Sequence, residues 1–279
     1  MLQGRDTMLR KIYRNPQAVA GLAMITAIGL AALFAPLLAP NDPNTVNIAN
    51  TYARASAPYP LGTDEMGRCV LSRLLYGARY SLGIAVPTLL LLALFSTAVS
   101  TVCAYAGGKT DRIFSAVCDI FMAFPPLLIA VTLIGSLGHG IANIIISIIF
   151  SMWVWFARIV RTFVLQEKNK EYVTACRIAG CSDLQIVLGH ILPNVLPQLI
   201  VYFSTGVASI VLTVSGYAFL GFGFETGTPE WGAMFSQASS YLYSHPRLLV
   251  YPGLCIIFTT AGFNLFGEAL RDIISPEEA

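Results

Sequence analysis

Long apolar runs and short polar segments alternate along the whole chain. Six of the runs are long enough to cross about 30 Å of hydrocarbon as α-helices. Inside lipid the backbone must satisfy its own hydrogen bonds, so these runs are predicted as helices and the chain as an all-α polytopic membrane protein. The expected spans lie near residues 18–38, 81–107, 113–137, 141–162, 195–220 and 248–270. Kinks or helix ends are expected at Pro36, Pro87, Pro125 and Pro126.

The composition supports this assignment. Hydrophobic residues make up 56% of the 279 positions and charged residues only 11%, and the mean hydropathy is +0.68. A soluble domain carries about 25% charged residues, so this chain cannot cover a large surface facing water. The net charge of +2 provides no basic field for nucleic acid. We expect a cytoplasmic segment at 1–17, whose following apolar run is too long for a cleaved signal peptide, and a single transmembrane domain at 18–279.

The basic residues predict the orientation of the chain in the membrane. If the N-terminus is inside, twelve of the 17 Lys and Arg residues fall in inside segments and five in outside segments. Cytoplasmic loops carry the excess of Lys and Arg, so both termini are expected inside. The polar segment at about 165–192 is then predicted to be cytoplasmic.

Two segments are expected outside. In the first, residues 40–80, Thr63 or Asp64 is a candidate N-cap for an amphipathic helix with its apolar stripe at 70–78, which we interpret as lying in the outer interface. The alternative is that this stripe is the early part of the second span. In the second segment, residues 221–246, Trp231, Tyr241 and Tyr243 are typical of an aromatic belt at the bilayer edge.

The polar segment between the fourth and fifth spans predicts a helix, a glycine turn and a second helix. Gly180 fits the C′ position that closes the first helix. Ser182 and Gln185 form a capping-box pattern that opens the second, and Pro193 is expected to interrupt the chain before the fifth span. A short amphipathic helix that projects from the membrane can insert into a groove of a partner. The alternative is an interfacial helix resting on lipid.

Candidate chemistry is sparse. Asp119 is the one carboxylate well inside an expected span, where a charge is costly, so it is a candidate structural ion pair with Arg158 or Arg161 or a candidate pathway residue. A secondary transporter would have to use it, and no pair of catalytic groups suggests an intramembrane enzyme. The sequence GGKT at 107–110 is not a phosphate-binding loop, because Cys103 stands where the pattern needs its first glycine. We expect a tight turn there, capped by Lys109 and Arg112, and no ATP, metal or cofactor bound by this chain.

The polar segment resembles the EAA loop of permease subunits of ATP-binding cassette importers. In that pattern Glu-Ala-Ala is followed after three residues by Gly and later by Ile-x-Leu-Pro. Here Thr174, Ala175 and Cys176 stand for the triplet, Gly180 has the right spacing, and the segment closes on HILP at 190–193. Thr174 departs from the family's Glu, and Glu171, one turn earlier, is the candidate to replace it. The resemblance implies that the ATPase-coupling residues are Glu171, Tyr172, Thr174, Ala175, Cys176, Arg177 and Gly180.

Further stretches are similar to the second permease of the dipeptide, oligopeptide and nickel importers. They are PLGTD (60–64), LSRLLYGAR (71–79), FPP (124–126), FLGFG (219–223), PEWG (229–232) and NLFGEALRD (264–272). Within this group, WVWFARIVR at 153–161 looks most similar to the nickel-type members.

The resemblance implies a type I importer permease in a bacterial plasma membrane. Its expected partners are a second homologous permease, two ATPase subunits that use ATP and Mg²⁺, an extracytoplasmic substrate-binding protein and membrane lipid. The implied cargo is nickel or a metal chelate, with dipeptides or oligopeptides as the alternative.

Overall fold

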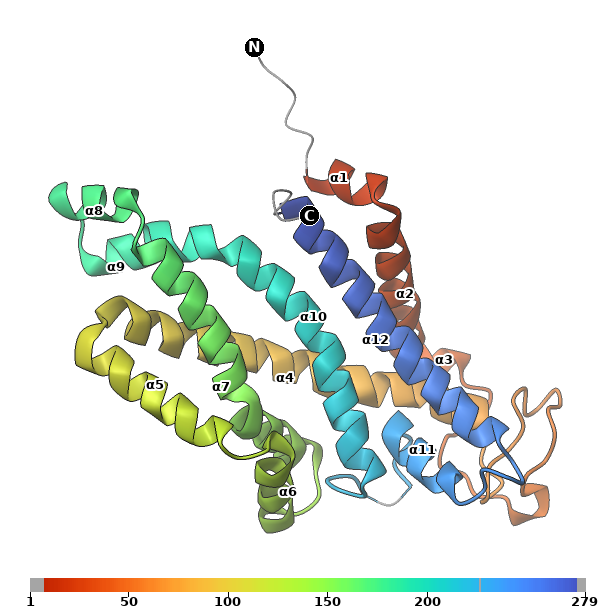
Figure 1. The fold of residues 1–279 in the computed structure, drawn as a ribbon. Coiled ribbons are helices and arrows are strands. Elements are labelled where there is room, and N and C mark those ends of the chain that lie inside the picture. Colours follow the sequence, from red (N-terminus) through yellow and green to blue (C-terminus); the bar gives the residue numbers. More distant parts are fainter. Residues whose placement is uncertain (1–7, 226, 275–279) are drawn as a thin grey trace.

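The computed structural model describes residues 8–225 and 227–274, and these are mostly helical (Figure 1). The described residues contain no β-strand, and one isolated bridge joins Thr63 to Cys69. The helices are α1 (Met8–Arg14), α2 (Pro16–Leu33), α3 (Ala35–Leu38), the 3-10 turn η1 (Ile48–Asn50), α4 (Val70–Ala106), α5 (Gly108–Met122), α6 (Pro126–Leu137), α7 (Ile141–Lys168), α8 (Glu171–Ile178), α9 (Asp183–Ile186), the π-helical turn η2 (Val187–Ile191), α10 (Leu192–Phe219), α11 (Trp231–Ser239) and α12 (Arg247–Ile274).

Five helices in the described ranges are long and apolar enough to cross a membrane: α2, α4, α7, the continuous helix Asp183–Phe219, and α12. The prediction of an all-α membrane protein is confirmed. The third expected span, residues 113–137, is not one helix: it is divided into α5 and α6, bent by 80°. Proline disfavours the helical conformation in the residue before it, and Pro125, which precedes Pro126, is extended with φ −59° and ψ 129°. The break therefore falls at the two prolines where a kink or helix end was expected, and the described residues hold six candidate spans if this bent pair counts as one.

The second span is longer than expected and includes the segment assigned to an interfacial helix. α4 begins at Val70, with Cys69 as its N-cap residue, and its 37 residues run without a break for about 55 Å. A separate interfacial helix capped by Thr63 or Asp64 was therefore the wrong expectation, and the alternative of an early second span is correct. Asp64 instead closes a turn, in which its Oδ1 accepts hydrogen bonds from the backbone N–H groups of Met66 and Arg68, both at 2.9 Å.

The main apolar core lies where α4, α6, α7 and α10 meet. Its buried residues include Leu89 from α4, Ile134 from α6, Ile148 from α7 and Ile210 from α10. A second close approach joins α2 to α12, where a Cβ added to Gly21 would come within 2.6 Å of the Phe266 backbone nitrogen. Small residues allow membrane helices to pack backbone to backbone, so this glycine fixes the distance between the first and last spans.

The turn between α4 and α5 is tight, as predicted, but another lysine caps it. Gly107 and Gly108 both have positive φ, at 68° and 56°. The Lys168 Nζ, at the end of α7, donates hydrogen bonds to the carbonyl oxygens of Ala104 (3.0 Å) and Tyr105 (2.6 Å). Lysine stabilises the carbonyl end of a helix, so Lys168 has the role expected of Lys109.

Pro193 does not interrupt the chain before the fifth span. The helix runs continuously from Asp183 to Phe219, and the π-helical turn η2 ends two residues before the proline. A π turn contains an extra residue, which lets the helix continue around a proline that lacks a backbone N–H. The expectation of a break was wrong for this reason.

Trp231 was expected at the bilayer edge but is completely buried. Its indole Nε1 donates a hydrogen bond to the Leu74 carbonyl oxygen at 3.0 Å, so it holds α11 against the start of α4. Buried tryptophan usually satisfies its N–H in this way. Tyr243 is fully exposed and remains a candidate for the aromatic belt.

Figure 1 shows which segments share an end of the molecule. α1, α8, α9 and the last turns of α12 lie at one end, while α6, α11 and the loops between α3 and α4 lie at the other. This arrangement is compatible with the predicted orientation, in which the two termini and the polar segment at 165–192 share a side.

Candidate docking site and neighbouring polar clusters

The underside of α8 is anchored to the inner ends of the long helices. Val173 is completely buried and packs in a cluster with Ala104, Val164 and Ile186. Tyr172 is partly buried, and its hydroxyl donates a hydrogen bond to the Glu167 Oε1 at 3.0 Å. Burial raises the pKa of the Tyr172 phenol above its usual value, so it remains a neutral donor.

The turn between α8 and α9 has the geometry predicted from the sequence. Gly180 has φ 83°, and its N–H donates to the Arg177 carbonyl oxygen at 3.0 Å. The Cys181 N–H donates to the Cys176 carbonyl oxygen at 3.1 Å, which completes a Schellman motif. Ser182 and Gln185 then form a reciprocal capping box, so the hairpin is rigid at its bend.

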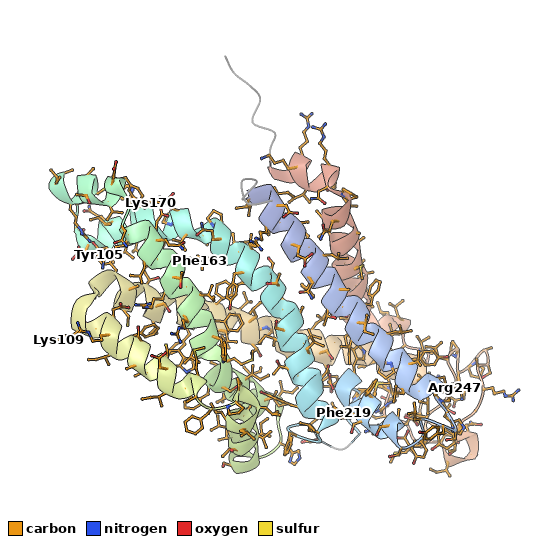
Figure 2. All side chains as sticks on the ribbon, in the orientation of Figure 1. Tyr105, Lys109, Phe163, Lys170, Phe219 and Arg247 are labelled. Carbon is orange, nitrogen blue, oxygen red and sulfur yellow. The ribbon has the colours of Figure 1, made fainter. Side chains whose placement is uncertain are left out.

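The opposite side of this hairpin is open. Five of the seven candidate coupling residues are exposed: Glu171, Thr174, Ala175, Arg177 and Gly180. Tyr172 and Cys176 are partly buried and face the protein's own core. Ile178 and Leu184 are 83% and 67% exposed, so apolar side chains project next to the exposed candidates. Figure 2 shows the hairpin projecting past Tyr105 at the end of α4.

Glu171 is the first residue of α8, and its side chain is exposed. A carboxylate in the first turn of a helix interacts favourably with the helix dipole. It lies one turn before Thr174, as required if it replaces the carboxylate missing from the triplet. His190, which takes the place of the family's Ile, is exposed in the π turn.

Two ion pairs join α5 to α7. Asp119 lies 2.9 Å from the Arg158 Nη1, so it contacts one of the two partners considered for it, and both side chains are about half exposed. Arg161 instead binds both carboxylate oxygens of Asp111, at 2.6 and 2.7 Å. The sequence placed Asp119 near both arginines but did not assign the pairing.

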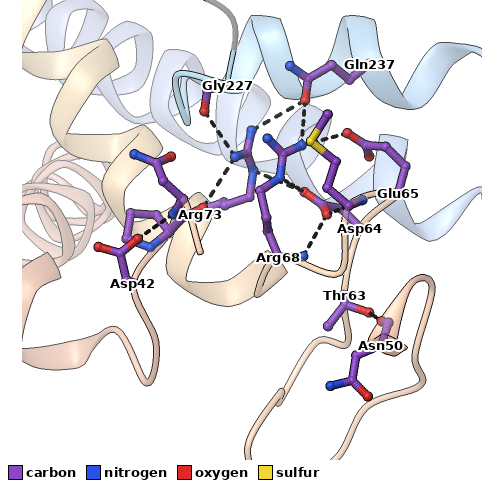
Figure 3. A network of polar contacts seen from close by, with 12 residues as sticks. Asp42, Asn50, Thr63, Asp64, Glu65, Arg68, Arg73, Gly227 and Gln237 are labelled. Carbon is purple, nitrogen blue, oxygen red and sulfur yellow. Dashed lines mark hydrogen bonds and ion pairs between the residues drawn. The ribbon is translucent and has the colours of Figure 1, made fainter. Parts of the chain in front are cut away.

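A buried polar cluster at the other end of the molecule was not recognised from the sequence (Figure 3). Arg68 and Arg73 are 3% and 1% exposed, and their side chains lie beside each other. The Arg68 Nε lies 2.7 Å from the Asp64 Oδ2, and the Arg73 Nε lies 3.5 Å from the same atom. Arg68 also pairs with Glu65 at 2.6 Å, and both arginines donate to the Gln237 Oε1 at 3.4 Å. The balance of two acids and two arginines within ten residues was the available signal.

Glu230 was also missed. Its side chain is completely buried. Its Oε1 accepts hydrogen bonds from Ser81 (2.9 Å) and Ser215 (3.1 Å), and its Oε2 accepts one from the Ala233 N–H (3.0 Å). Burial raises the pKa of the Glu230 carboxyl above its usual value, although these hydrogen bonds oppose the shift. Glu230 caps α11 at its N-terminus, where a carboxylate interacts favourably with the helix dipole.

Comparison with known proteins identifies the family. The sequence model of the family described as "binding-protein-dependent transport system inner membrane component" matches residues 96–278. That of the "N-terminal TM domain of oligopeptide transport permease C" matches residues 4–58. The nickel transport system permease protein of Escherichia coli (strain K12) is 34% identical over 91% of this chain and 92% of its own length.

This chain belongs to the inner-membrane permease family of binding-protein-dependent transporters. The metal-staphylopine import system permease protein of Staphylococcus aureus is 33% identical over 96% of this chain and 93% of its own length. The dipeptide transport system permease protein of Alkalihalophilus pseudofirmus is 33% identical over 96% and 88%. The resemblance to the dipeptide, oligopeptide and nickel importers is confirmed.

As a member of this family, the chain is a multi-pass inner-membrane permease subunit of an ATP-binding cassette importer and not an enzyme. The family works with ATPase and substrate-binding partners. The hairpin formed by α8 and α9 is exposed on the side away from its buried base.

Proposed function

We propose that this permease forms half of a translocation pathway together with a second, homologous permease. Two ATPase subunits, which use ATP and Mg²⁺, dock on its cytoplasmic side, and an extracytoplasmic binding protein delivers cargo from outside. Both chain termini and the α8–α9 hairpin face the cytoplasm, as the distribution of Lys and Arg predicts.

The exposed side of the hairpin carries this proposal. Thr174, Ala175 and Ile178 are exposed on a helix whose other side is fixed by the buried Val173. A short helix that is rigid at its base and apolar at its surface can fill a groove of a soluble partner. Closure of the ATPase pair on ATP moves the hairpin, and hydrolysis resets it. This coupling requires different contacts of the hairpin in the two states.

The cargo we propose is nickel or a metal chelate. The stretch WVWFARIVR at 153–161, which looks most similar to nickel-type members, supports this choice. Short peptides are the second candidate, because the dipeptide permease is as similar to this chain as the two metal permeases are. Selectivity is then set mostly by the binding protein, since a shared fold serves different cargoes.

Asp119 serves, in this proposal, as the structural partner of Arg158. Their ion pair, at 2.9 Å, supports a structural role over a proton site because it neutralises both charges. A secondary transporter that uses Asp119 would carry cargo without ATP, which the experiment below excludes or detects.

The test is co-purification followed by transport. The tagged permease is isolated with the proteins expressed beside it, and the complex is reconstituted in liposomes with its binding protein. We expect ATPase subunits and a second permease to accompany the tagged chain, and uptake to require ATP. Calorimetry of the binding protein with nickel, nickel–histidine and dialanine identifies the cargo. Uptake by this chain alone without ATP would overturn the proposal.

A further inference from the structure

Tyr105, in the last turn of α4, joins the ends of four helices. Its hydroxyl donates a hydrogen bond of 2.6 Å to the Asp183 Oδ1, in the first turn of α9. The Arg177 guanidinium of α8 lies 5.6 Å from the centre of its ring. The Lys168 Nζ, at the end of α7, lies at the same distance, 5.6 Å. Cations over an aromatic face are attracted to it, so the ring holds parts of α7 and α8 next to α4.

The end of α4 is also fixed through its backbone. Lys168 donates to the carbonyl oxygens of Ala104 and Tyr105, which joins the ends of α7 and α4 directly. Ala104 is completely buried in the cluster that contains Val173 of α8 and Ile186 of α9. The underside of the hairpin therefore rests on the end of α4, although α4 is distant from the hairpin in sequence.

The opposite end of α4 is fixed just as firmly. Arg73 lies in the buried cluster with Asp64 and Gln237. The Leu74 carbonyl oxygen accepts from Trp231, and Ser81 donates to Glu230, so two further bonds join α4 to the start of α11. An unbroken helix of 37 residues thus connects the hairpin at one end with the outer polar cluster at the other.

We propose that Tyr105 is a positioning residue that transmits displacement of the α8–α9 hairpin to α4. α7 and α10 flank the hairpin in the chain and move with it through the backbone, whereas α4 contacts it through side chains, among them Tyr105 with Asp183 and Arg177. Through Tyr105, α4 becomes the third helix, after α7 and α10, that moves with the hairpin. α4 then links the docking surface to the buried polar cluster around Arg73. The inference rests on the proposed function, since a docked ATPase must displace the hairpin.

A purely stabilising role for Tyr105 predicts a different result from a transmitting one. Loss of stability lowers the amount of complex, and it lowers ATP hydrolysis and uptake together. Loss of transmission leaves assembly and hydrolysis in place and lowers the cargo carried for each ATP. The ratio of ATP hydrolysed to cargo transported therefore separates the two roles.

The experiment measures this ratio in the reconstituted complex, with its ATPases and binding protein, on radiolabelled nickel with histidine and on radiolabelled dialanine. Tyr105→Phe removes the bond to Asp183 and keeps the ring, while Tyr105→Leu removes both. Asp183→Asn weakens the same bond from its other side. Tyr13, 73% exposed on α1, provides the controls Tyr13→Phe and Tyr13→Leu.

We expect Tyr105→Leu to raise the ratio about tenfold and Tyr105→Phe about threefold, because leucine removes both the hydrogen bond to Asp183 and the ring contacts with the two cations, whereas phenylalanine removes only the hydrogen bond. ATP hydrolysis per complex stays within about twofold of the wild type because no ATPase contact is removed. Tyr105→Phe combined with Asp183→Asn acts no more strongly than Tyr105→Phe alone, because both substitutions affect the same hydrogen bond.

Wild-type ratios in Tyr105→Phe and Tyr105→Leu would overturn the inference, as would a parallel fall of hydrolysis and uptake. If Tyr105→Leu does not assemble, Tyr105→Phe decides by the same ratio. A wild-type complex without ATP-driven uptake refutes the proposed function, and this inference with it. If the wild type transports cargo with ATP and the variants have the same ratio of ATP hydrolysed to cargo transported, the role of Tyr105 is refuted but the proposed function stands.

Discussion

Arg161 holds Asp111 by both of its carboxylate oxygens, with Nε–Oδ1 at 2.6 Å and Nη2–Oδ2 at 2.7 Å. The pair joins the last third of α7 to the first turn of α5, and both side chains are less than a third exposed. Paired guanidinium and carboxylate groups fix orientation as well as distance, because the two planar groups match. This contact therefore sets the position of the start of α5 against α7, at the end of α5 away from the break at Pro125.

Replacement of Arg161 should loosen this junction. Arg161→Ala is expected to lower the stability of the purified complex by about 2 kcal/mol, because Asp111 loses two charge-assisted hydrogen bonds. Arg161→Lys should cost about half as much, since an ammonium cannot reproduce the two-point geometry. Thermal unfolding of the complex measures both, with the exposed Arg112→Ala as the control. Equal losses of stability in Arg161→Ala and Arg112→Ala would show that the Arg161–Asp111 pair does not stabilise the junction of α5 and α7.

The Asp119–Arg158 pair predicts a different phenotype. Asp119→Asn should lower the yield of assembled complex more than it changes the preference between nickel–histidine and dialanine. Position 119 lies about 16 Å from the start of α5. Asp119→Asn leaves the charge of Arg158 unpaired at this depth, where an unpaired charge is costly. Arg158→Gln added to Asp119→Asn should restore yield, because no charge then remains unpaired. Normal yield with an altered preference would instead assign Asp119 to the pathway.

Glu230 predicts a pH dependence. Burial raises the pKa of its carboxyl in the folded protein above the unfolded value of about 4.3, so the folded state favours the protonated form. Its contribution to stability is complete below the unfolded pKa and is lost as the pH rises through the folded pKa. The unfolding temperature of the wild type should therefore fall over this window relative to that of Glu230→Gln.

The glutamine variant is a matched comparison for Glu230. Its carbonyl oxygen can accept from the Ala233 N–H, and its amide can donate to Ser81 and Ser215, but it does not ionise. Unfolding temperatures measured between acid and neutral pH should diverge, with the wild type falling faster. Parallel curves for the two proteins would show that Glu230 does not titrate in this window.

The docking surface can be tested without disturbing the fold. Ala175 is exposed in the free chain, so Ala175→Arg should leave the permease stable yet lower co-purification of ATPase and ATP-driven uptake by about tenfold, as loss of a central contact does. Tyr13→Arg is the control. Gly180→Arg is less specific, because φ 83° at this position costs a side chain about 1–2 kcal/mol. Full transport by Ala175→Arg would exclude the hairpin as the docking element.

The contact between α2 and α12 offers a paired test within one helix. Gly21→Val should destabilise the chain by about 1–3 kcal/mol, because its side chain would collide with the backbone of Phe266 and Gly262. Gly29→Val, on the same helix, meets no atom within 4 Å and should be neutral. Protease resistance of the two variants in membranes measures the difference. Equal resistance would mean that α2 is not held against α12.

Local patterns predicted the hairpin correctly because its geometry is set by nearby residues. Gly180 needs only its own φ, and Ser182 needs only Gln185 three residues later, so the motifs at 180–185 could be inferred from sequence. The same holds for the apolar runs, since their length decides whether they span a membrane.

Features that depend on distant residues were not predictable. The burial of Arg73 was not foreseen, because it depends on contacts with Asp64 and with Gln237, which lies far away in the sequence. Trp231 was wrongly assigned to the membrane edge. Its hydrogen-bond acceptor, the Leu74 carbonyl oxygen, is 157 positions away, so its burial could not be inferred from neighbouring residues. Pro193 normally breaks a helix, and nothing in its neighbours indicates the π turn that compensates for it.

The bend at Pro125 has a consequence for how the chain is made. α6 has 12 residues and is about 18 Å long, so it cannot thread through a bilayer core of about 30 Å as an independent segment. Ala130 and Ile134 pack instead against Ile144 and Ile148 of the next helix. We therefore expect α5, α6 and α7 to enter the membrane together, as one hairpin-shaped unit, rather than one span at a time.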